Sequence, residues 1–458
     1  MGKKQSRITF LIVMIVALMF LFSVHDGNAV PSFARQTSLS CNSCHTMYPE
    51  LTPFGRHFKI MGYVMSKSTK SYEFPPPVTG VAKVSFTHTD KAQPRGSVEN
   101  TWANALNTTQ NNFFYIPQVL GLYYAGKIYY KFGALIQGNY EGVDNNFVLD
   151  ITDIRYGDMI FGDKFMYGVT IDNVPTLGDP WNSVPAWGFP YESSDVAPSP
   201  AAGAIIDGAL ANQVGGINLF VYLYTTLYIQ AGAYRTTKDG ITKPLGAGTD
   251  TTTLVDDAVP YWRVALQRQW GKHSAEIGTY GIWAKIYPEG FMYGAKDRFT
   301  DIAVDGQYQY IGKKHLFSVQ ATWIYENQDW NASFALGDTA RRSGHLNTFK
   351  INTNYYYRSR LGTIGGTVGY FLTTGNNDSG LYAPEQIDGS RSGSPDSSGV
   401  ILEADYLPFG GRRTTLSPKL TAQYVIYNKF NGSASNYDGF GRDASDNNMF
   451  YLLIRMMF

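Results

Sequence analysis

The chain has 458 residues, of which 15% are aromatic, 47 are glycine and only 16% are charged, and its formal net charge is +1. Soluble domains carry roughly 25% charged residues, so this composition favours a β-rich membrane protein over a series of soluble domains. A helical membrane protein is excluded, because no apolar run of about 18 residues follows the N-terminus and the mean hydropathy is −0.21.

Residues 1–29 have the pattern of a secretory signal peptide. Three basic residues precede an apolar run over residues 8–24, and Gly27 and Ala29 are the small residues of a cleavage site. The alternative is a retained membrane anchor. Cleavage removes three basic residues and one acidic residue, which leaves 35 Lys+Arg against 36 Asp+Glu. A chain so close to neutral gives no electrostatic reason to expect a nucleic-acid partner.

The only two cysteines form the motif Cys41-Asn42-Ser43-Cys44-His45. This C-x-x-C-H spacing is the attachment signature of c-type haem, in which two thiols bond to the haem vinyl groups and the adjacent histidine binds the iron. A zinc site would need a second Cys/His pair, and a thioredoxin-like redox pair would need a βαβ context. We therefore expect one covalent haem c, held by Cys41 and Cys44 with His45 as an axial ligand.

A short helix is predicted over residues 53–61. Thr52 is a favourable N-cap, Pro53 suits the first helical position, and Gly62 stands where a helix-terminating glycine is common. The apolar face of this helix, which includes Phe58, would pack against the haem.

The second axial ligand of the iron is predicted to be Met65. This methionine follows the helix stop at Gly62 on an extended segment that can turn back over the distal side of the haem. Met61 and His57 are the alternatives, and an open or different ligation also remains. Met47 lies too close in the chain to the proximal histidine to reach the opposite face easily.

From residue 78 onward, apolar and polar residues alternate over segments of about ten residues, as in 302–310 and 317–325. This period is typical of transmembrane β-barrel strands. Sixteen strands are predicted, at about 79–89, 113–124, 127–138, 147–157, 164–173, 204–222, 227–236, 259–270, 273–284, 299–310, 314–326, 344–357, 361–374, 399–407, 413–427 and 447–458.

The predicted connections alternate between short turns and long polar loops. Ala125-Gly126, Gly271-Lys272 and Gly410-Gly411 are typical of the short ones. Outer-membrane barrels have short periplasmic turns and long external loops. The chain also ends in alternating apolar residues up to Phe458, which resembles the C-terminal strand of outer-membrane proteins.

The connection over residues 174–203 is unusual, because its prolines and tryptophans make it stiff and partly apolar. It contains Asp179, Trp181 and Trp187. The alternation of connections places it on the outer side. It could fold into the lumen and shape access beside the haem, or it could be a structural lid on the barrel edge.

The predicted fold class is all-β. The chain would form a transmembrane outer-membrane β-barrel of about sixteen strands with a short, partly helical, haem-binding plug at its N-terminus. The corresponding domains are a signal peptide (1–29), a monohaem cytochrome c segment and linker (30–77), and a porin-like barrel (78–458). About forty residues are too few to bury a haem unaided, whereas a sixteen-stranded barrel has room for them in its lumen.

The run Val30-Pro31-Ser32-Phe33-Ala34-Arg35-Gln36-Thr37, the haem motif, and the stretch from Pro49 to Tyr63 resemble the fused monohaem cytochrome–porins of the outer membrane. The resemblance extends over most of the chain and is most specific at 30–63 and 172–190. Ser38 stands where that family usually has glycine. The family is associated with extracellular iron oxidation.

The resemblance implies electron transfer across the outer membrane through a single haem c. The protein would be embedded in outer-membrane lipid, take electrons from extracellular Fe(II) and pass them to a periplasmic cytochrome c. No pattern of a catalytic acid, base or nucleophile is recognised. The alternatives are a diffusion porin whose haem plug gates or senses redox state, and a haem enzyme with an open distal site.

Overall fold

The computed structural model describes residues 30–65, 76–93, 109–236, 253–288, 290, 294–408 and 416–458. The predicted signal peptide 1–29 and the predicted Gly410-Gly411 turn lie outside these residues, as does most of the expected linker.

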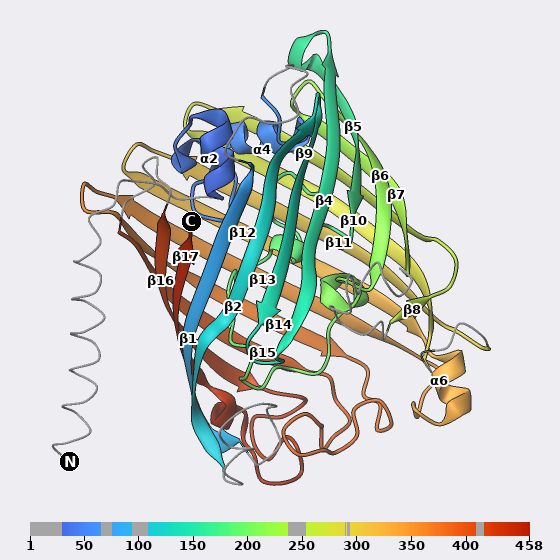
Figure 1. Ribbon diagram of the computed structural model, residues 1–458. Helices are drawn as coiled ribbons and strands as arrows, with labels where there is room; N and C mark the ends of the chain where they lie inside the picture. Colours follow the sequence, from blue (N-terminus) through green and yellow to red (C-terminus); the bar gives the residue numbers. More distant parts are fainter. Residues whose placement is uncertain are drawn as a thin grey trace, which may run out of the picture.

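Sixteen long strands of the described residues form one closed antiparallel barrel (Figure 1). Consecutive long strands pair with each other, and β1 pairs with β17 to close the sheet, so that no edge remains unpaired. The long strands are β1 (Val78–Gln93), β2 (Gln110–Tyr129), β3 (Phe132–Glu141), β4 (Asn146–Ile160), β5 (Phe165–Asp172), β6 (Val214–Leu223), β7 (Leu227–Thr236), β9 (Val259–Trp270), β10 (His273–Tyr287), β11 (Asp297–Ile311), β12 (His315–Asp329), β13 (Ser343–Arg358), β14 (Thr363–Gly375), β15 (Ser397–Leu407), β16 (Ser417–Lys429) and β17 (Met449–Met457). The two-residue strand β8 (Leu254–Val255) pairs with β10.

The predicted number of strands is confirmed, but two predicted boundaries are wrong. The strand expected over 204–222 begins only at Val214, because 205–209 form a helical turn inside the barrel. The expected turn at Ala125-Gly126 is part of β2, since these residues pair with Leu135 and Ala134. The chain instead turns at residues 130–131.

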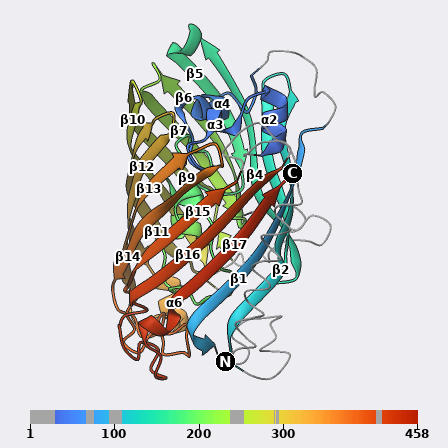
Figure 2. The same cartoon turned by 90° about the vertical axis from the view of Figure 1, so that its left-hand side faces the viewer.

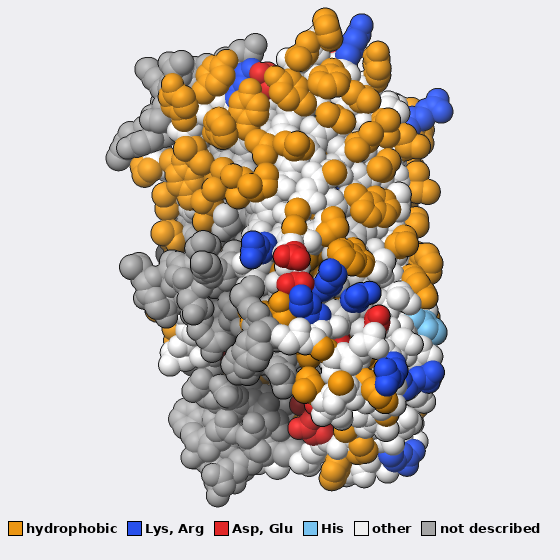
Figure 3. All heavy atoms as spheres, turned by 90° about the vertical axis from the view of Figure 1, so that its right-hand side faces the viewer, with side chains coloured by type: hydrophobic (Ala, Val, Ile, Leu, Met, Phe, Trp, Pro, Cys, Tyr) orange, Lys and Arg blue, Asp and Glu red, His pale blue; other side chains and the backbone are white. Residues whose placement is uncertain are grey.

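The barrel wall is apolar outside and polar inside. On β9 the outward side chains of Trp262, Val264 and Leu266 are 37–51% exposed, whereas the inward Arg263 and Gln267 are buried. This pattern is the reverse of a soluble protein and is typical of a barrel surrounded by hydrocarbon. Figure 3 shows hydrophobic side chains spread over the upper part of the wall, with most charged side chains below them. Among the described residues, no helix is long and apolar enough to cross a membrane.

Three helices at the start of the described chain, α2 (Pro31–Thr37), α3 (Cys41–Cys44) and α4 (Pro53–Ile60), lie within residues 30–65, which we call the plug. Figures 1 and 2 show these helices at the end of the barrel where the C-terminus lies. The short turns between strands are at this end, because β1 begins and β17 ends here. Ser32 joins α2 to the wall, its backbone N–H donating to Thr79 Oγ1 (3.0 Å) and its hydroxyl donating to the Ala125 carbonyl oxygen (2.8 Å).

The predicted helix over 53–61 is confirmed as α4. Its N-cap Thr52 accepts a hydrogen bond from the Gly55 backbone N–H (3.1 Å), and Gly62 follows its end with a φ of +69°. The short helix α6 (Asn331–Leu336) lies in a loop at the other end of the barrel.

Residues 173–213, which connect β5 to β6 and which we call the inner loop, run through the lumen. Leu177, Trp181 and Val184 of this loop are at most 1% exposed. Trp181 packs in one apolar cluster with Ile60 of the plug and with wall residues such as Tyr228. The loop therefore lies inside the barrel, as the first of the two interpretations predicts, and it joins the plug to the wall.

A substitution at Gly157 of β4 tests how the plug packs against the barrel wall. A Cβ atom at this position would overlap the Ile60 carbonyl oxygen and the Met61 backbone at the end of α4. We expect Gly157→Ala to destabilise the packing of the plug against the wall by about 1–3 kcal/mol. Residues 30–65 should then become sensitive to limited proteolysis, while the barrel still migrates as a folded species on unheated gels. Gly138→Ala on the neighbouring strand, where there is room for a methyl group, is the control. Equal protease resistance in both variants would contradict this account.

Candidate functional site

The two cysteines are held on one helical turn. They occupy the first and last positions of α3, and the His45 backbone N–H closes the turn by donating to the Cys41 carbonyl oxygen (2.8 Å). Neither cysteine forms a disulfide in the structure. Burial raises the pKa of the Cys44 thiol to about 11, so this side chain is neutral, as a thioether would be.

The imidazole of His45 is oriented by the chain that follows it. Its Nδ1 lies 3.1 Å from the Glu50 carbonyl oxygen. Because a carbonyl oxygen only accepts, Nδ1 carries the proton in this hydrogen bond, and Nε2 is left as the nitrogen available to a metal. Burial lowers the pKa of His45 to about 4, so the ring is neutral near pH 7. This is the form in which histidine binds iron.

Glu50 fixes the turn after the motif to the barrel wall. Its carboxylate is 1% exposed and accepts hydrogen bonds from Thr46 Oγ1 (2.8 Å), from Ser318 Oγ (2.6 Å) and from the Asn354 amide. Ser318 and Asn354 lie on β12 and β13. The backbone carbonyl that orients His45 is therefore positioned by two strands of the wall.

A mostly apolar cavity adjoins the motif, and we call it the plug cavity. Cys41, Cys44 and His45 all line it, together with Val30, Phe33, Ala34, Thr37, Leu39, Ser40, Tyr48, Leu51, Gly55, Phe58, Lys59, Tyr63, Leu135, Asn182 and Trp187. Phe33 stacks on Tyr63 with 5.2 Å between ring centroids. Two thiols, a neutral and oriented imidazole and aromatic walls on one cavity are a donor set that fits a covalently attached haem.

The candidates for the second axial ligand lie outside the lining of the plug cavity. Met65 is 54% exposed at the end of the described plug. Met61 packs against the cluster around Ile60 and Trp181, and His57 is partly buried on α4. The structure thus brings Cys41, Cys44 and His45 together but adds none of the three candidates, and the assignment of Met65 stays a prediction.

Lys59 of α4 fastens the plug to the inner loop. Its Nζ donates to the carbonyl oxygens of Leu177 (3.0 Å) and Asp179 (2.6 Å) and to Asn182 Oδ1 (2.9 Å). It also lies 4.7 Å from the centre of the Trp187 ring. Burial lowers the pKa of Lys59 to about 7. In this buried position, oxygen atoms of the inner loop take the place of water around the amino group.

Arg56, one turn before Lys59, fastens the plug to the wall. Its guanidinium donates to Gln267 Oε1 (2.6 Å), to Ser274 Oγ (2.8 Å) and to Gln307 Oε1 (2.9 Å). Gln267 Oε1 also accepts from Trp181 Nε1 (2.7 Å). One wall glutamine thus joins the plug and the inner loop.

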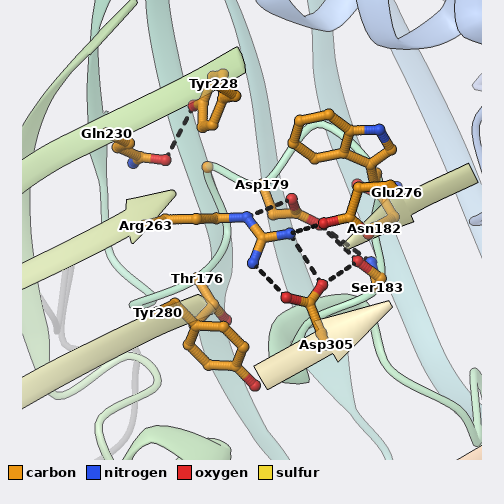
Figure 4. Close-up of polar contacts among 12 residues, drawn as sticks. Thr176, Asp179, Asn182, Ser183, Tyr228, Gln230, Arg263, Glu276, Tyr280 and Asp305 are labelled. Carbon is orange, nitrogen blue, oxygen red and sulfur yellow. Dashed lines mark hydrogen bonds and ion pairs between the residues drawn. The ribbon is translucent and has the colours of Figure 1, made fainter. Parts of the chain in front are cut away.

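Asp179 of the inner loop belongs to a buried ionic cluster around Arg263 of β9 (Figure 4). The Arg263 guanidinium forms ion pairs with Asp179 (2.9 Å), Asp305 (2.9 Å) and Glu276 (3.2 Å), and all four side chains are at most 1% exposed. Ser183 of the same loop donates to Asp305 (2.7 Å). The cluster holds the inner loop against three strands.

A second cavity continues into the lumen from the plug cavity, and we call it the lumen cavity. Tyr48 and Trp187 line both cavities, so these aromatic rings lie between them. Both charged and apolar side chains line the lumen cavity, and Glu192 in this lining pairs with Lys83 (2.6 Å) and Arg455 (3.2 Å). Within the described ranges, no group of three or more His, Cys, Asp or Glu side chains is arranged to hold a metal ion directly.

Of the inner-loop residues selected from the sequence, only Trp187 reaches the plug cavity. Asp179 and Trp181 are fully buried between the loop and the wall and would act through the position of the loop. Sequence reasoning missed Glu50 and Lys59. Both are charged residues in a segment that was predicted to lie inside the barrel, where a charge needs polar partners. Their charge was therefore a signal in the sequence that they form specific contacts there.

No family model and no curated protein matches the chain. Solved structures of outer-membrane barrels are remotely similar. The anion-selective porin of Comamonas acidovorans shares 10% identity over 83% of this chain and 98% of its own (TM-score 0.44). OmpF of Salmonella typhi in complex with daunomycin shares 13% identity over 83% and 97% (TM-score 0.44). The trimer form of OmpT from Vibrio cholerae shares 10% identity over 83% and 98% (TM-score 0.44).

The strand pairing and the apolar exterior establish the coarse identity of the molecule by themselves. It is a porin-like β-barrel of the outer-membrane type, and its outer face contacts membrane lipid.

Arg263→Met tests the ionic cluster. The change leaves three buried carboxylates without their shared counter-charge, and we expect it to destabilise the folded barrel by about 3–5 kcal/mol. The measurement is the temperature at which the barrel loses its folded mobility on denaturing gels. Arg298→Met, at an exposed position of β11, is the matched control and should leave that temperature unchanged. Equal temperatures for the two variants would show that the cluster is not a stabilising element.

Proposed function

We propose that the protein transfers single electrons across the outer membrane by means of one haem c. Cys41 and Cys44 would carry the thioether bonds, and His45 would bind the iron. A haem bound there supplies a one-electron centre at the periplasmic end of an otherwise insulating membrane. The observation that carries the proposal is the convergence of both thiols and of the oriented, neutral His45 ring on one mostly apolar cavity.

The resemblance of residues 30–63 to fused monohaem cytochrome–porins supports the same function and suggests extracellular Fe(II) as the electron donor. Such a donor suits this architecture, because its oxidised product is insoluble and would have to stay outside the cell. A periplasmic cytochrome c would accept the electron. The plug lies at the short-turn end, which faces the periplasm in outer-membrane barrels.

The inner loop would shape access from the outer side. Trp187 and Tyr48 line both the plug cavity and the lumen cavity, so a donor that enters the lumen meets these rings before the haem. Asp179 and Trp181 keep the loop in place through Arg263 and Gln267.

A second candidate function is a diffusion porin whose haem-carrying plug gates solute passage or senses redox state. The charged side chains in the lining of the lumen cavity, such as Lys83, Glu192 and Arg455, favour this alternative. The haem would be bound in both functions. The two functions differ in what would pass through the lumen, which is an electron donor in the first and a diffusing solute in the second.

The haem is tested first. We expect the purified protein to keep peroxidase-active haem stain on a denaturing gel, because thioether bonds survive denaturation. Cys44→Ala should reduce the stain strongly, and the double change Cys41→Ala with Cys44→Ala should abolish it, since these are the only thiols. Ser43→Ala, between the two cysteines, is the control. Stain that persists in the double variant would refute the site.

The direction of electron entry is tested in intact cells. Fe(II) in a small chelate on a long flexible tether should reduce the haem, where the tether lets the chelate enter the lumen and its bulky polymer end prevents it from crossing the outer membrane. The double variant Asp179→Ala with Trp181→Ala should slow this reduction by roughly tenfold or more, because small displacements of positioning groups are costly. Haem content should not change. Arg263 keeps Asp305 and Glu276 as partners in this variant.

Trp323→Ala, on the lipid-facing side of β12, is the matched control for that experiment. Reduction by small permeant donors alone would contradict entry from outside. If this result came with rapid flux of small sugars into liposomes, the porin alternative would be supported instead.

A further inference from the structure

The described connections at the two ends of the barrel carry opposite formal charge. The six described short turns contain six basic residues and one acidic residue, within 130–131, 161–164, 224–226, 271–272, 312–314 and 359–362. The described long connections outside the lumen contain eleven acidic and five basic residues, within 142–145, 256–258, 294–296, 330–342, 376–396 and 430–448. Among these described connections, the net charge is therefore positive at the short-turn end and negative at the other.

Most of the basic residues at the short-turn end are exposed. We call this set the basic rim, and it consists of Lys164, Lys272, Lys313, Lys314 and Arg360. The sixth basic residue, Lys131, is buried against Asp158, with which it forms an ion pair. Asp163 is the one acidic residue among these turns. Figure 3 shows a few basic side chains at the top edge of the barrel, whereas the lower half of this face carries both basic and acidic side chains.

The basic rim lies at the same end as the plug cavity. Gln36 of α2 contacts the strand end next to the first short turn, because its Oε1 accepts from the Lys127 backbone N–H (2.9 Å). On the His45 side, Arg358 donates from Nη2 to the His45 carbonyl oxygen (3.1 Å) just before the turn that bears Arg360. The apolar side chain of Phe54 in the plug is also exposed at this end (37%). A partner that docks here meets a basic border and an apolar centre.

We propose that the basic rim is a docking surface for an acidic electron-carrier protein of the periplasm. This inference rests on the proposed electron-transfer function and adds the chemistry of the acceptor. One electron passes per encounter, so the acceptor is reduced by one electron while the protein is oxidised by one. A carrier must arrive and leave quickly, and charge complementarity raises the association rate without the large apolar interface of a permanent complex.

Two features favour a protein partner over the other anionic surface nearby, the phospholipid headgroups. The plug places the exposed ring of Phe54 at the same end, where a docked protein can cover it. The opposite charge of the described connections at the far end also contributes a field along the barrel axis, which orients an acidic carrier towards the plug. A lipid-binding rim would need neither feature.

The test compares one carrier fold in two charge states. The holoprotein is placed in nanodiscs of neutral phosphatidylcholine, and the binding of a basic cytochrome c and of the same cytochrome with succinylated lysines is measured by biolayer interferometry. We expect the succinylated form to bind at least about tenfold more tightly at low ionic strength. Its affinity should fall steeply as salt is added.

Lys313→Glu with Lys314→Glu should weaken binding of the succinylated cytochrome about tenfold. Arg341→Glu with Arg342→Glu, a double charge reversal in a long connection, is the matched control and should leave binding unchanged. Equal binding of both cytochromes, or tighter binding of the basic one, would overturn the proposal, and this comparison needs no variant that might misfold.

A lipid role is a separate outcome. If the succinylated cytochrome does not bind and the Lys313/Lys314 variant loses affinity only for vesicles of phosphatidylglycerol, the rim is a lipid contact and the proposal is wrong. Failure of the proposed function is distinguishable, because the haem absorbance of the same preparation reports on the haem independently of binding.

Discussion

The hydrocarbon of the membrane around the barrel wall determines which side chains face the interior. Each strand has to turn its apolar side chains outward, and its polar side chains then face the lumen, as β9 does with Trp262 outside and Arg263 inside. Any segment that fills such a lumen must offer partners to buried polar groups. The plug does so with charged side chains rather than with an apolar face alone, and Glu50, Arg56 and Lys59 are all buried and hydrogen-bonded.

These contacts make the plug, the inner loop and the wall one unit. Gln267 of the wall binds both Arg56 and Trp181, and Lys59 binds the loop backbone next to Asp179. Residues 30–65 have little core of their own, so their conformation depends on the barrel. The orientation of His45 follows from this dependence, because Glu50 orients the imidazole and is itself held by β12 and β13.

The position of the plug gives the molecule a direction. The cavity with the cysteines is at the short-turn end, whereas the lumen cavity and the inner loop separate it from the long connections. Electron exchange on the two sides would therefore face different requirements. A donor would approach through the lumen, which the inner loop partly fills, whereas an acceptor would meet the plug end bordered by Lys272, Lys313 and Lys314.

The sequence by itself determined the class of the protein. Alternation with period two, the sorting of short and long connections and the C-x-x-C-H spacing are local patterns, and the helix over 53–60 followed from Thr52, Pro53 and Gly62. The strand number and most strand boundaries could be predicted for the same reason. The error at 204–213 arose because an apolar segment buried by a lumen loop has the same composition as a buried strand.

Only the tertiary structure decided which residues surround the site. Glu50, which orients His45, and Lys59 and Tyr48, which line the plug cavity, contact strands and loops that are more than 100 residues away in the chain. The placement of Trp187 beside Cys41 and His45 is of the same kind. Such contacts depend on how a closed barrel folds its own loop and N-terminus into a polar lumen. Local spacing carries no information about that arrangement, because it results from three-dimensional packing and from the partners that buried charges require.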